Sequence, residues 1–420
     1  MAHNPAPQDI PGVPARLAAL RLIDAVLRRG DPLDQAAPPV LRAIERGDDR
    51  ALALAIAQEA LRWLADLDAL IDANTRQRLP DDAKARSVLR LMLAQALRLD
   101  LPPHAVIATG LPLLMGGPRR RAHGVFSAVL KSGAGLPDAP TLPERALGRW
   151  AAAWPDRIEA IAASLALPPP LDLSLRDPAE TEMWAQRLGG TSLLPGHVRL
   201  ARGGPVEALE GYSEGAWWVQ DLAASIPARL LGAGQGRRVL DLCAAPGGKT
   251  LQLAAMGWQV TAIDKSARRV ERLTANLART GLVAEVITAD VMQWRPPEAL
   301  FDAVLVDAPC SATGTCRRHP DVLHRPIPFA DLLSLQRDLL ERAAGAIRSG
   351  GQMVYAVCSL EPQEGEQQAA WVKALARVPL AADQLPAGIV PTPEGWFRSD
   401  PGMLADAGGI DGFFAAVWEK

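Results

Sequence analysis

Two cysteines of this chain, Cys310 and Cys358, each follow an apolar run with the composition of a buried strand. Because the carboxyl ends of parallel strands meet at one edge of a sheet, we expect the two thiols to lie close together there. A lone free cysteine is usually a small buried hydrophobic residue, but two at neighbouring strand ends favour a chemical role. The reaction that uses such a pair is methylation at carbon 5 of a pyrimidine.

In that reaction a thiolate first adds to carbon 6, which makes carbon 5 nucleophilic enough to attack a sulfonium methyl group. An acid or hydrogen-bond donor at N3 stabilises the developing charge, and Asp307 could serve if burial raises its pKa. The carbon 5 proton must then leave and the thiolate must be eliminated, a step that a second cysteine can assist. Strands at 301–306 and 352–357 are expected to position these residues.

A loop of small residues follows another predicted strand, at 237–242, and reads Cys243-Ala244-Ala245-Pro246-Gly247-Gly248-Lys249-Thr250. Small residues let a backbone approach a ligand closely, yet neither a dinucleotide-binding nor a P-loop pattern is present. The next two predicted strands, at 259–263 and 284–289, end in Asp264 and Asp290, placed for ribose hydroxyls and an adenine edge. Each carboxylate alone could equally be a helix N-cap, but together with the loop they favour S-adenosylmethionine as cofactor.

The chain changes character twice along its length. Residues 1–135 show helical periodicity, with breaks at Gly30–Pro32, 79–81 and 101–103, and predict an all-α domain. Residues 136–215 are richer in Pro and Gly and include a predicted strand at 171–175, which indicates a small α+β connecting module. In residues 216–420 strands alternate with helices, which predicts an α/β domain with a parallel sheet covered by helices on both faces.

Composition sets limits on the classes of protein to consider. The 420 residues are 49% hydrophobic and carry a formal net charge of −2, so any affinity for nucleic acid must come from local basic patches. The four cysteines lack metal-ligand spacing, and we expect neither disulfides nor a metal site. No signal sequence or apolar run of membrane-spanning length is evident, so we expect a cytoplasmic protein with no membrane association. We also expect a monomer.

The motifs resemble those of the RsmB/Sun-type RNA cytosine-5 methyltransferases, from one end of the chain to the other. The resemblance rests on the loop from Cys243 to Thr250, on Asp307-Ala308-Pro309-Cys310-Ser311-Ala312-Thr313-Gly314, and on the late Asp411-Gly412-Phe413-Phe414-Ala415. It implies a Rossmann-like class I S-adenosylmethionine-dependent methyltransferase fold for the last domain. It also implies a NusB-like RNA-binding fold for the helical domain, and that pairing points to 16S rRNA as the substrate.

The resemblance further implies a role for each site residue. Cys358 would be the nucleophile and Cys310 would assist release of the adduct. Lys249 and Asp307 would extend toward the base. The cofactor site would be lined by Cys243, Ala244, Ala245, Pro246, Gly247, Gly248, Lys249, Asp264, Asp290 and Asp307.

Two features of the chain depart from the family pattern. Val357 precedes the expected nucleophile where the family commonly has threonine, which removes a hydroxyl but leaves the thiol in place. The segment Val322-Leu323-His324 replaces a stretch that usually carries tryptophan. The first departure bears on a local hydrogen bond beside the thiol, and the second bears on the details of the target site.

Two arginine clusters are candidates for contact with RNA. Arg119, Arg120 and Arg121 open the last helix of the predicted helical domain, and Arg317, Arg318 and His319 follow the Cys310 motif. Such groups neutralise phosphates without reading sequence. A short basic run can equally be a solvated surface, and this alternative carries more weight for the first cluster.

Other functions share parts of this pattern. Methylation of cytosine 5 in tRNA would use the same chemistry, although the helical domain argues against it. A DNA cytosine-5 methyltransferase would place its nucleophile at Cys310 and would not need Cys358. A non-catalytic NusB-like RNA-binding protein would need neither cysteine.

Overall fold

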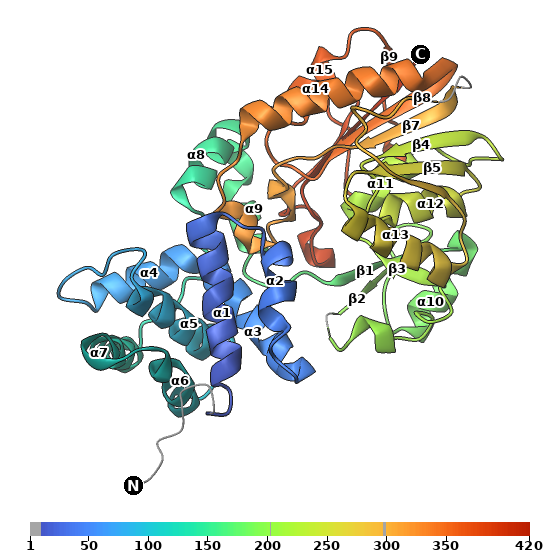
Figure 1. Cartoon of the computed structure of the whole chain (residues 1–420). Coiled ribbons are helices and arrows are strands. Elements are labelled where there is room, and N and C mark those ends of the chain that lie inside the picture. The colour runs from blue at the N-terminus through green and yellow to red at the C-terminus, as the bar shows by residue number, and fades with distance from the viewer. Residues whose placement is uncertain (1–9, 202, 297–299) are drawn as a thin grey trace. The chain divides into compact units, whose positions relative to one another are not determined.

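The computed structural model describes residues 10–201, 203–296 and 300–420, and these residues form two compact units (Figure 1). The helical unit contains the chain before Leu167 together with Arg318–Ile327. The sheet unit contains Leu167–Arg317 and Pro328–Lys420. The predicted division into domains 1–135, 136–215 and 216–420 stays a prediction.

The helical unit confirms the all-α fold predicted for the first part of the chain. Its helices are α1 (Val13–Asp24), α2 (Leu33–Leu41), α3 (Gly47–Arg62), α4 (Leu64–Ala73), α5 (Lys84–Arg98), α6 (Pro103–Gly110), α7 (Gly116–Ser132), α8 (Glu144–Ala153) and α9 (Ile158–Ser164). The breaks fall where glycine and proline predict them. Gly30, with φ of 73°, ends the first helical stretch after a π-helical turn, and Pro103 begins α6.

An apolar core holds these helices together. Leu20 and Ile23 of α1 and Leu89 and Met92 of α5 are fully or almost fully buried in one cluster. These residues recur at the spacing of one helical face, so the pattern that predicted the helices also determines which side of each helix packs inward.

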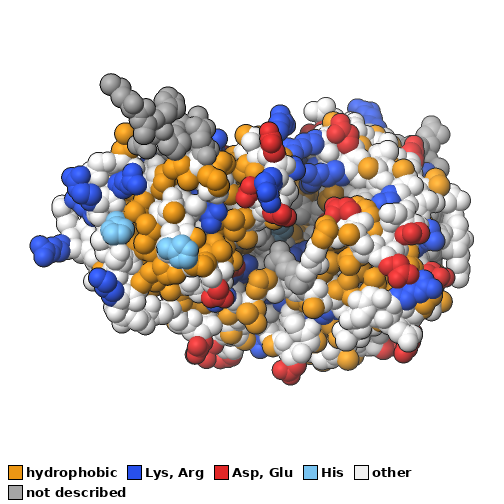
Figure 2. Space-filling model, turned by 90° about the horizontal axis from the view of Figure 1, so that it is seen from below, with side chains coloured by type: hydrophobic (Ala, Val, Ile, Leu, Met, Phe, Trp, Pro, Cys, Tyr) orange, Lys and Arg blue, Asp and Glu red, His pale blue; other side chains and the backbone are white. Residues whose placement is uncertain are grey.

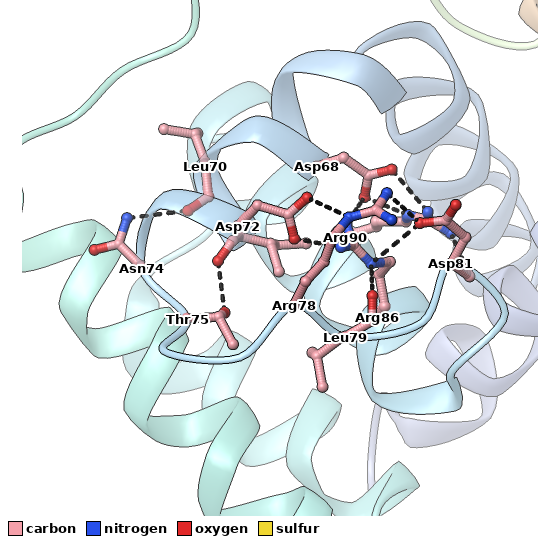
Figure 3. A network of polar contacts seen from close by, with 11 residues as sticks. Asp68, Leu70, Asp72, Asn74, Thr75, Arg78, Leu79, Asp81, Arg86 and Arg90 are labelled. Carbon is pink, nitrogen blue, oxygen red and sulfur yellow. Dashed lines mark hydrogen bonds and ion pairs between the residues drawn. The ribbon is translucent and has the colours of Figure 1, made fainter.

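A network of ion pairs joins α4 to α5 beside this core. Figure 3 shows Arg86 and Arg90 of α5 directed toward the carboxylates of α4. Asp68 accepts hydrogen bonds of 2.8 Å from Nε and Nη2 of Arg90 and lies 2.9 Å from Nη1 of the fully buried Arg86. Arg86 also pairs with Asp72 and donates to the carbonyl of Leu79 at 3.0 Å. A buried guanidinium is tolerated only with such compensation.

Residues 318–327 belong to the helical unit although both flanking segments belong to the sheet unit. A short 3₁₀ turn at Pro320–Leu323 packs against α3. The backbone N–H of Leu33 donates to Asp321 at 3.1 Å, and the Nε2 atom of His324 lies 2.7 Å from the carbonyl oxygen of Leu61. The departures from the family pattern at Val322, Leu323 and His324 therefore lie in a segment that completes the helical unit.

The sheet unit begins with a small antiparallel sheet. Its strands are β1 (Leu171–Leu175), β2 (His197–Leu200) and β3 (Trp217–Val219), in the order β2-β1-β3, with α10 (Thr181–Arg187) packed beside β2. Asp172 of β1 is buried and makes a bidentate ion pair with Arg199 of β2 at 2.7 and 2.8 Å. The strand predicted at 171–175 is confirmed.

The larger sheet has the order β10-β11-β8-β7-β4-β5-β6, and β9 pairs with β11. Its strands are β4 (Arg238–Leu242), β5 (Gln259–Asp264), β6 (Glu285–Thr288), β7 (Phe301–Asp307), β8 (Ile347–Val357), β9 (Ala376–Val378), β10 (Phe397–Ser399) and β11 (Phe413–Glu419). The helices are α11 (Leu222–Arg229), α12 (Gly248–Ala255), α13 (Ala267–Thr280), α14 (Phe329–Ala346) and α15 (Glu366–Trp371).

The prediction of a parallel sheet is right for β4 to β8 and wrong for the remaining strands. β11 runs antiparallel to β8, starting with Phe414 opposite Val357, and β9 and β10 are antiparallel to β11. After β8 the chain passes through α15 toward the opposite end of the sheet, where β9 begins, and returns along β10, so that β11 starts at the edge where β8 stops. A strand entered in this way must run antiparallel.

Alternating residues of the central strands face two separate cores. Leu305 of β7 and Val354 of β8 pack with α11, α12 and α13, whereas Val306 and Tyr355 pack with α14. Figure 1 shows these helices on the two sides of the sheet. Burial on both faces explains the continuous apolar runs from which these strands were predicted. Within the described residues, no helix has the length and apolarity needed to cross a membrane.

Candidate active site

The loop that follows β4 carries the small-residue motif and ends at the start of α12. Gly247 has φ of 108°, and a Cβ atom there would collide with the side chain of Leu273 in α13. The backbone N–H of Ala244 donates to the carbonyl of Ile263 at 3.0 Å, and that of Ala245 donates to Asp264 at 3.2 Å. Only glycine fits at 247, so the motif reflects how closely the loop packs between β4, β5 and α13.

The two predicted acidic residues lie at adjacent strand ends. Asp264 ends β5 and is buried; besides the bond from Ala245 it accepts from the N–H of Ser266 at 2.8 Å and from Arg269 at 2.8 and 2.9 Å. Asp290 follows β6, is exposed, and accepts from the N–H of Met292 at 2.9 Å. Both carboxylates therefore lie at the carboxyl edge of the parallel part of the sheet, and their role in holding a cofactor stays a prediction.

A cleft brings these elements together where the strand order reverses, with β5 and β6 on one side of β4 and β7 and β8 on the other. Residues of the β4 loop, of the ends of β5 and β6, of the β7 loop and of α14 line it, among them Cys243, Asp264, Asp290, Pro309, Leu335 and Leu339. Burial raises the pKa of the Cys243 thiol to about 12. This cysteine therefore lines the cleft as an uncharged thiol and does not act as a nucleophile.

Lys249 and Asp307 are joined by a short ion pair. Nζ of Lys249, in the first turn of α12, lies 2.7 Å from Oδ2 of Asp307 at the end of β7. The ammonium group also lies 5.1 Å from the ring centroid of Phe413. The buried Lys249 and the partly buried Asp307 were predicted separately, from two motifs. They therefore form one charged pair beside the cleft.

The two cysteines meet as their strands predict. β7 and β8 are parallel neighbours with Asp307 opposite Ala356, and the Sγ atoms of Cys310 and Cys358 lie 3.6 Å apart. The hydrogen bond with Cys358, together with burial, raises the pKa of the Cys310 thiol well above its usual range. Cys310 therefore stays protonated at neutral pH and can donate to the neighbouring sulfur.

Val357, the departure from the expected threonine, is fully buried in the apolar core that includes Phe414 and Tyr355. A valine methyl group fits these neighbours without needing a hydrogen-bond partner. With valine at position 357, Cys358 is still the residue that directly follows β8.

One residue of the site was missed by the sequence analysis. The carboxylate of Glu364 is fully buried and accepts hydrogen bonds from the serines that follow each of the two cysteines, Ser311 and Ser359. No signal in the sequence distinguishes it, because Glu361, Glu364 and Glu366 lie together in one polar stretch.

The basic residues after the Cys310 motif have different surroundings. Arg317 is only 3% exposed; its Nη1 atom donates to the carbonyl of Gly408 at 2.7 Å and its Nε atom lies 3.6 Å from Asp411. Arg318 is half-buried and His319 is exposed. Arg317 thus braces the loop before β11, and the prediction that this cluster contacts RNA stays a prediction.

Arg119, Arg120 and Arg121 are all exposed on the first turns of α7. Arg121, together with Lys84, lines an apolar groove of the helical unit. Figure 2 shows hydrophobic side chains gathered on one face of the helical unit, with Lys, Arg and His side chains at its border. The guanidinium groups of such an exposed basic cluster are accessible to phosphate groups.

No group of three or more His, Cys, Asp or Glu side chains in the described part of the chain is arranged to hold a metal ion.

Comparison with known families gives two matches along the chain. Residues 228–416 match the family described as 16S rRNA methyltransferase RsmB/F, and residues 13–132 match the NusB family. The chain is also similar to the curated ribosomal RNA small subunit methyltransferase B of Klebsiella pneumoniae, with 35% identity over 87% of this chain and 90% of the relative. The Shigella flexneri protein of the same name is 33% identical over 96% of this chain and 97% of its own.

Solved structures share the fold. The crystal structure of PH0851 superposes with a TM-score of 0.73 and 22% identity, covering 96% of this chain and 98% of that one. NSun6 from Pyrococcus horikoshii, solved with SFG, gives a TM-score of 0.57 and 17% identity over 66% of this chain and 98% of its own. These similarities confirm the Rossmann-like architecture predicted for the last part of the chain.

Proposed function

Since the chain belongs to the RsmB/F family of 16S rRNA methyltransferases, we propose that it methylates carbon 5 of a cytosine in 16S rRNA with S-adenosylmethionine as methyl donor. The observation that carries this proposal is the pair of thiols, Cys310 and Cys358, whose Sγ atoms lie 3.6 Å apart at the ends of neighbouring strands. Methylation of a carbon that needs covalent activation requires a nucleophile there, whereas transfer to nitrogen or oxygen does not.

The residues of the cleft fit the proposed cofactor. The loop from Cys243 to Lys249 presents small side chains and backbone, and Asp264 and Asp290 offer carboxylates at adjacent strand ends. These residues, with Asp307, would hold S-adenosylmethionine, which supplies an electrophilic methyl group when bound. The absence of a phosphate-binding glycine pattern agrees with a cofactor that has no phosphates.

We assign the first chemical step to Cys358. Its thiolate would add to carbon 6 of the cytosine, which forms a C–S bond and moves an electron pair of the ring toward carbon 5 and N3. Asp307 would face N3, and the 2.7 Å pair with Lys249 keeps an ammonium proton next to that carboxylate. As negative charge develops on the ring, N3 would take up a proton supplied by the Lys249 ammonium through Asp307, and that proton would return to the pair when the adduct breaks down.

Release would depend on Cys310. After carbon 5 is methylated its proton leaves to a base, the C6–S bond breaks, and the electrons of that bond return to Sγ of Cys358. The protonated thiol of Cys310, 3.6 Å from that sulfur, can donate a hydrogen bond to the departing thiolate. The raised pKa of Cys310 favours this protonated state.

The helical unit would supply RNA affinity. The match of residues 13–132 to the NusB family supports this role, and Arg119, Arg120 and Arg121 offer exposed cations. The target cytosine would have to leave its stack to reach the cysteines, which favours a loop or an opened helix of the RNA. Location in the cytoplasm and a monomeric state belong to the same proposal.

Bisulfite sequencing of rRNA and tRNA tests the proposal, in cells that contain the wild-type protein, no protein, or the Cys358→Ala variant. We expect one cytosine of 16S rRNA to be protected only with the wild-type protein. Protection restricted to tRNA would agree with the proposed cytosine-5 methylation but would show that the substrate is not 16S rRNA. Protection that survives Cys358→Ala would overturn the nucleophile and favour a chemistry centred on Cys310.

A further inference from the structure

The carboxylate of Glu364 connects the two loops that carry the cysteines. The backbone N–H of Ser311 donates to Oε1 at 2.9 Å, and the Ser311 hydroxyl donates to Oε2. The hydroxyl of Ser359 donates to the same Oε2 atom at 2.6 Å. Ser311 directly follows Cys310 and Ser359 directly follows Cys358, so one side chain binds the residue next to each sulfur.

Further bonds hold the same two loops. The Oγ atoms of Ser311 and Ser359 lie 3.1 Å apart, the N–H of Gly314 donates to the carbonyl of Cys358 at 3.1 Å, and the N–H of Leu360 donates to Thr313 at 3.0 Å. Glu364 is the acceptor shared by both loops in this set. Because two hydroxyl groups converge on a single oxygen, the direction of both donors is fixed by that oxygen.

The backbone of Glu364 is anchored independently of its side chain. Its carbonyl accepts from the hydroxyl of Tyr355 at 2.7 Å, and its N–H donates to the carbonyl of Glu361 at 3.0 Å. Gln336 of α14 completes the environment, with Nε2 3.2 Å from Oε1. The carboxylate is 0% exposed, and a buried charge is tolerated only when donors surround it as they do here.

We propose that Glu364 is a positioning residue for methyl transfer, which sets the separation of the Cys310 and Cys358 sulfurs by holding Ser311 and Ser359. This inference rests on the proposed function, since it assigns the two sulfurs to one reaction. Glu364 touches neither substrate nor cofactor in this account. Its effect passes through the backbone of the two serines to the adjoining cysteines.

The experiment compares the full-length wild-type protein with the isosteric Glu364→Gln variant by two readouts. The first needs no substrate: the rate at which the Cys310–Cys358 disulfide forms with diamide, which takes up the two electrons and two protons lost by the thiols. Mass spectrometry of the linked peptides measures it, and Cys310→Ser is the blank. We expect the variant to form the disulfide about tenfold more slowly, because misplaced sulfurs meet less often.

The second readout is steady-state methylation at a range of concentrations of a 16S rRNA transcript, with covalent protein–RNA adduct measured on a denaturing gel. A displacement near 1 Å can lower the rate about 100-fold, so we expect kcat to fall by that order while KM for RNA changes less than twofold. A purely structural role would lower the folded fraction and leave both parameters of the folded enzyme unchanged.

Asp302→Asn is the matched control. Asp302 lies at the opposite end of β7 from Cys310 and binds the N–H of Arg238 at 2.7 Å and Arg348 at 2.6 Å. This variant should match the wild-type protein in both readouts. Ser359→Ala, which removes one of the two hydroxyl donors, should show an intermediate effect, and it replaces Glu364→Gln as the test if that variant does not fold.

The positioning role would be overturned if Glu364→Gln formed the disulfide and turned over at wild-type rates. The same result in Ser359→Ala would overturn it if Ser359→Ala has to replace Glu364→Gln as the test. Failure of the proposed function has a different signature. In that case the wild-type protein would not methylate the transcript, yet the disulfide rates would still report whether Glu364 positions the sulfurs.

Discussion

The Sγ atoms of Cys310 and Cys358 lie 3.6 Å apart, although the residues are 48 positions apart in the chain. Parallel pairing of β7 with β8 produces this approach, because both cysteines follow strands that end at the same edge. The proposed chemistry assigns opposite duties to the two sulfurs, so their variants should fail in different ways.

Replacement of Cys358 by Ala should abolish methyl transfer and adduct formation, since no thiolate remains to attack carbon 6. Replacement of Cys310 by Ala should allow attack but slow release, and covalent protein–RNA adduct should accumulate as a slow band on a denaturing gel. Cys316→Ala, at a buried cysteine outside the pair, is the control and should behave as wild type. Exchange of these phenotypes between Cys310 and Cys358 would reverse the assignment.

Gly247→Ala should weaken binding of the cofactor. The left-handed backbone at φ of 108° and the collision with Leu273 both oppose a Cβ atom, so the loop must shift. Strain of about 1–2 kcal/mol corresponds to roughly a tenfold loss of affinity, measurable by titration calorimetry with S-adenosylmethionine. Gly345→Ala in α14, where a Cβ atom meets nothing within 4 Å, should bind normally. Equal affinities for both variants would show that the loop does not approach the cofactor.

The stability of the sheet unit should depend on the protonation of Asp241. This residue of β4 is fully buried; Oδ2 accepts from Thr250 at 2.6 Å, and Oδ1 has no hydrogen-bond partner among the described residues. Burial raises the pKa of its carboxyl group to about 7. The folded protein therefore keeps this proton up to a higher pH than the unfolded chain, so its contribution to stability is complete below about pH 4 and is lost as pH rises through 7.

Asp241→Asn cannot lose that proton and should remove this dependence. Relative to the wild-type protein, its unfolding free energy should rise by about 4 kcal/mol between pH 4 and pH 8. Calorimetric melting of both proteins across this range measures the difference. Parallel curves would mean that Asp241 titrates normally in the folded protein.

Asp68→Ala should destabilise the helical unit. The change leaves the buried Arg86 and Arg90 with fewer partners, and loss of one member of a buried ion pair costs about 3 kcal/mol. Hydrogen exchange of peptides from α4 and α5, followed by mass spectrometry, should show the loss of protection. Asp48→Ala, which removes an exposed carboxylate 3.7 Å from Arg46, should cost less than about 1 kcal/mol. Unchanged exchange in Asp68→Ala would mean that the network does not stabilise the unit.

Much of the site follows from the sequence because it lies at strand ends. The apolar runs before Asp264, Asp307 and Cys358 predicted β5, β7 and β8 within a few residues, apart from the early start of β8 at Ile347. Parallel strands gather such ends at one edge whatever the details of packing. The cysteine pair and the Lys249–Asp307 pair are consequences of that rule.

The features that the sequence did not reveal depend on contacts between distant residues. The direction of β11 is set by the route of its connection, which leaves no periodic signal. The role of Glu364 depends on where Ser311 and Ser359 fall in space, 53 and 5 positions away. The buried carboxylate of Asp321 accepts a hydrogen bond from the backbone N–H of Leu33, 288 positions earlier in the chain. No local pattern reports any of these relationships.

The membership of residues 318–327 in the helical unit has a consequence for how the protein can be divided. The chain crosses between the units at 166–167, 317–318 and 327–328, rather than once. A truncation before Leu167 would keep this segment and remove α3, against which it packs, so that the buried side chains of Val322 and Leu323 would meet solvent. The residues before Leu167 therefore cannot be exchanged on their own. A chimaera with the helices of another family member would have to exchange residues 318–327 as well.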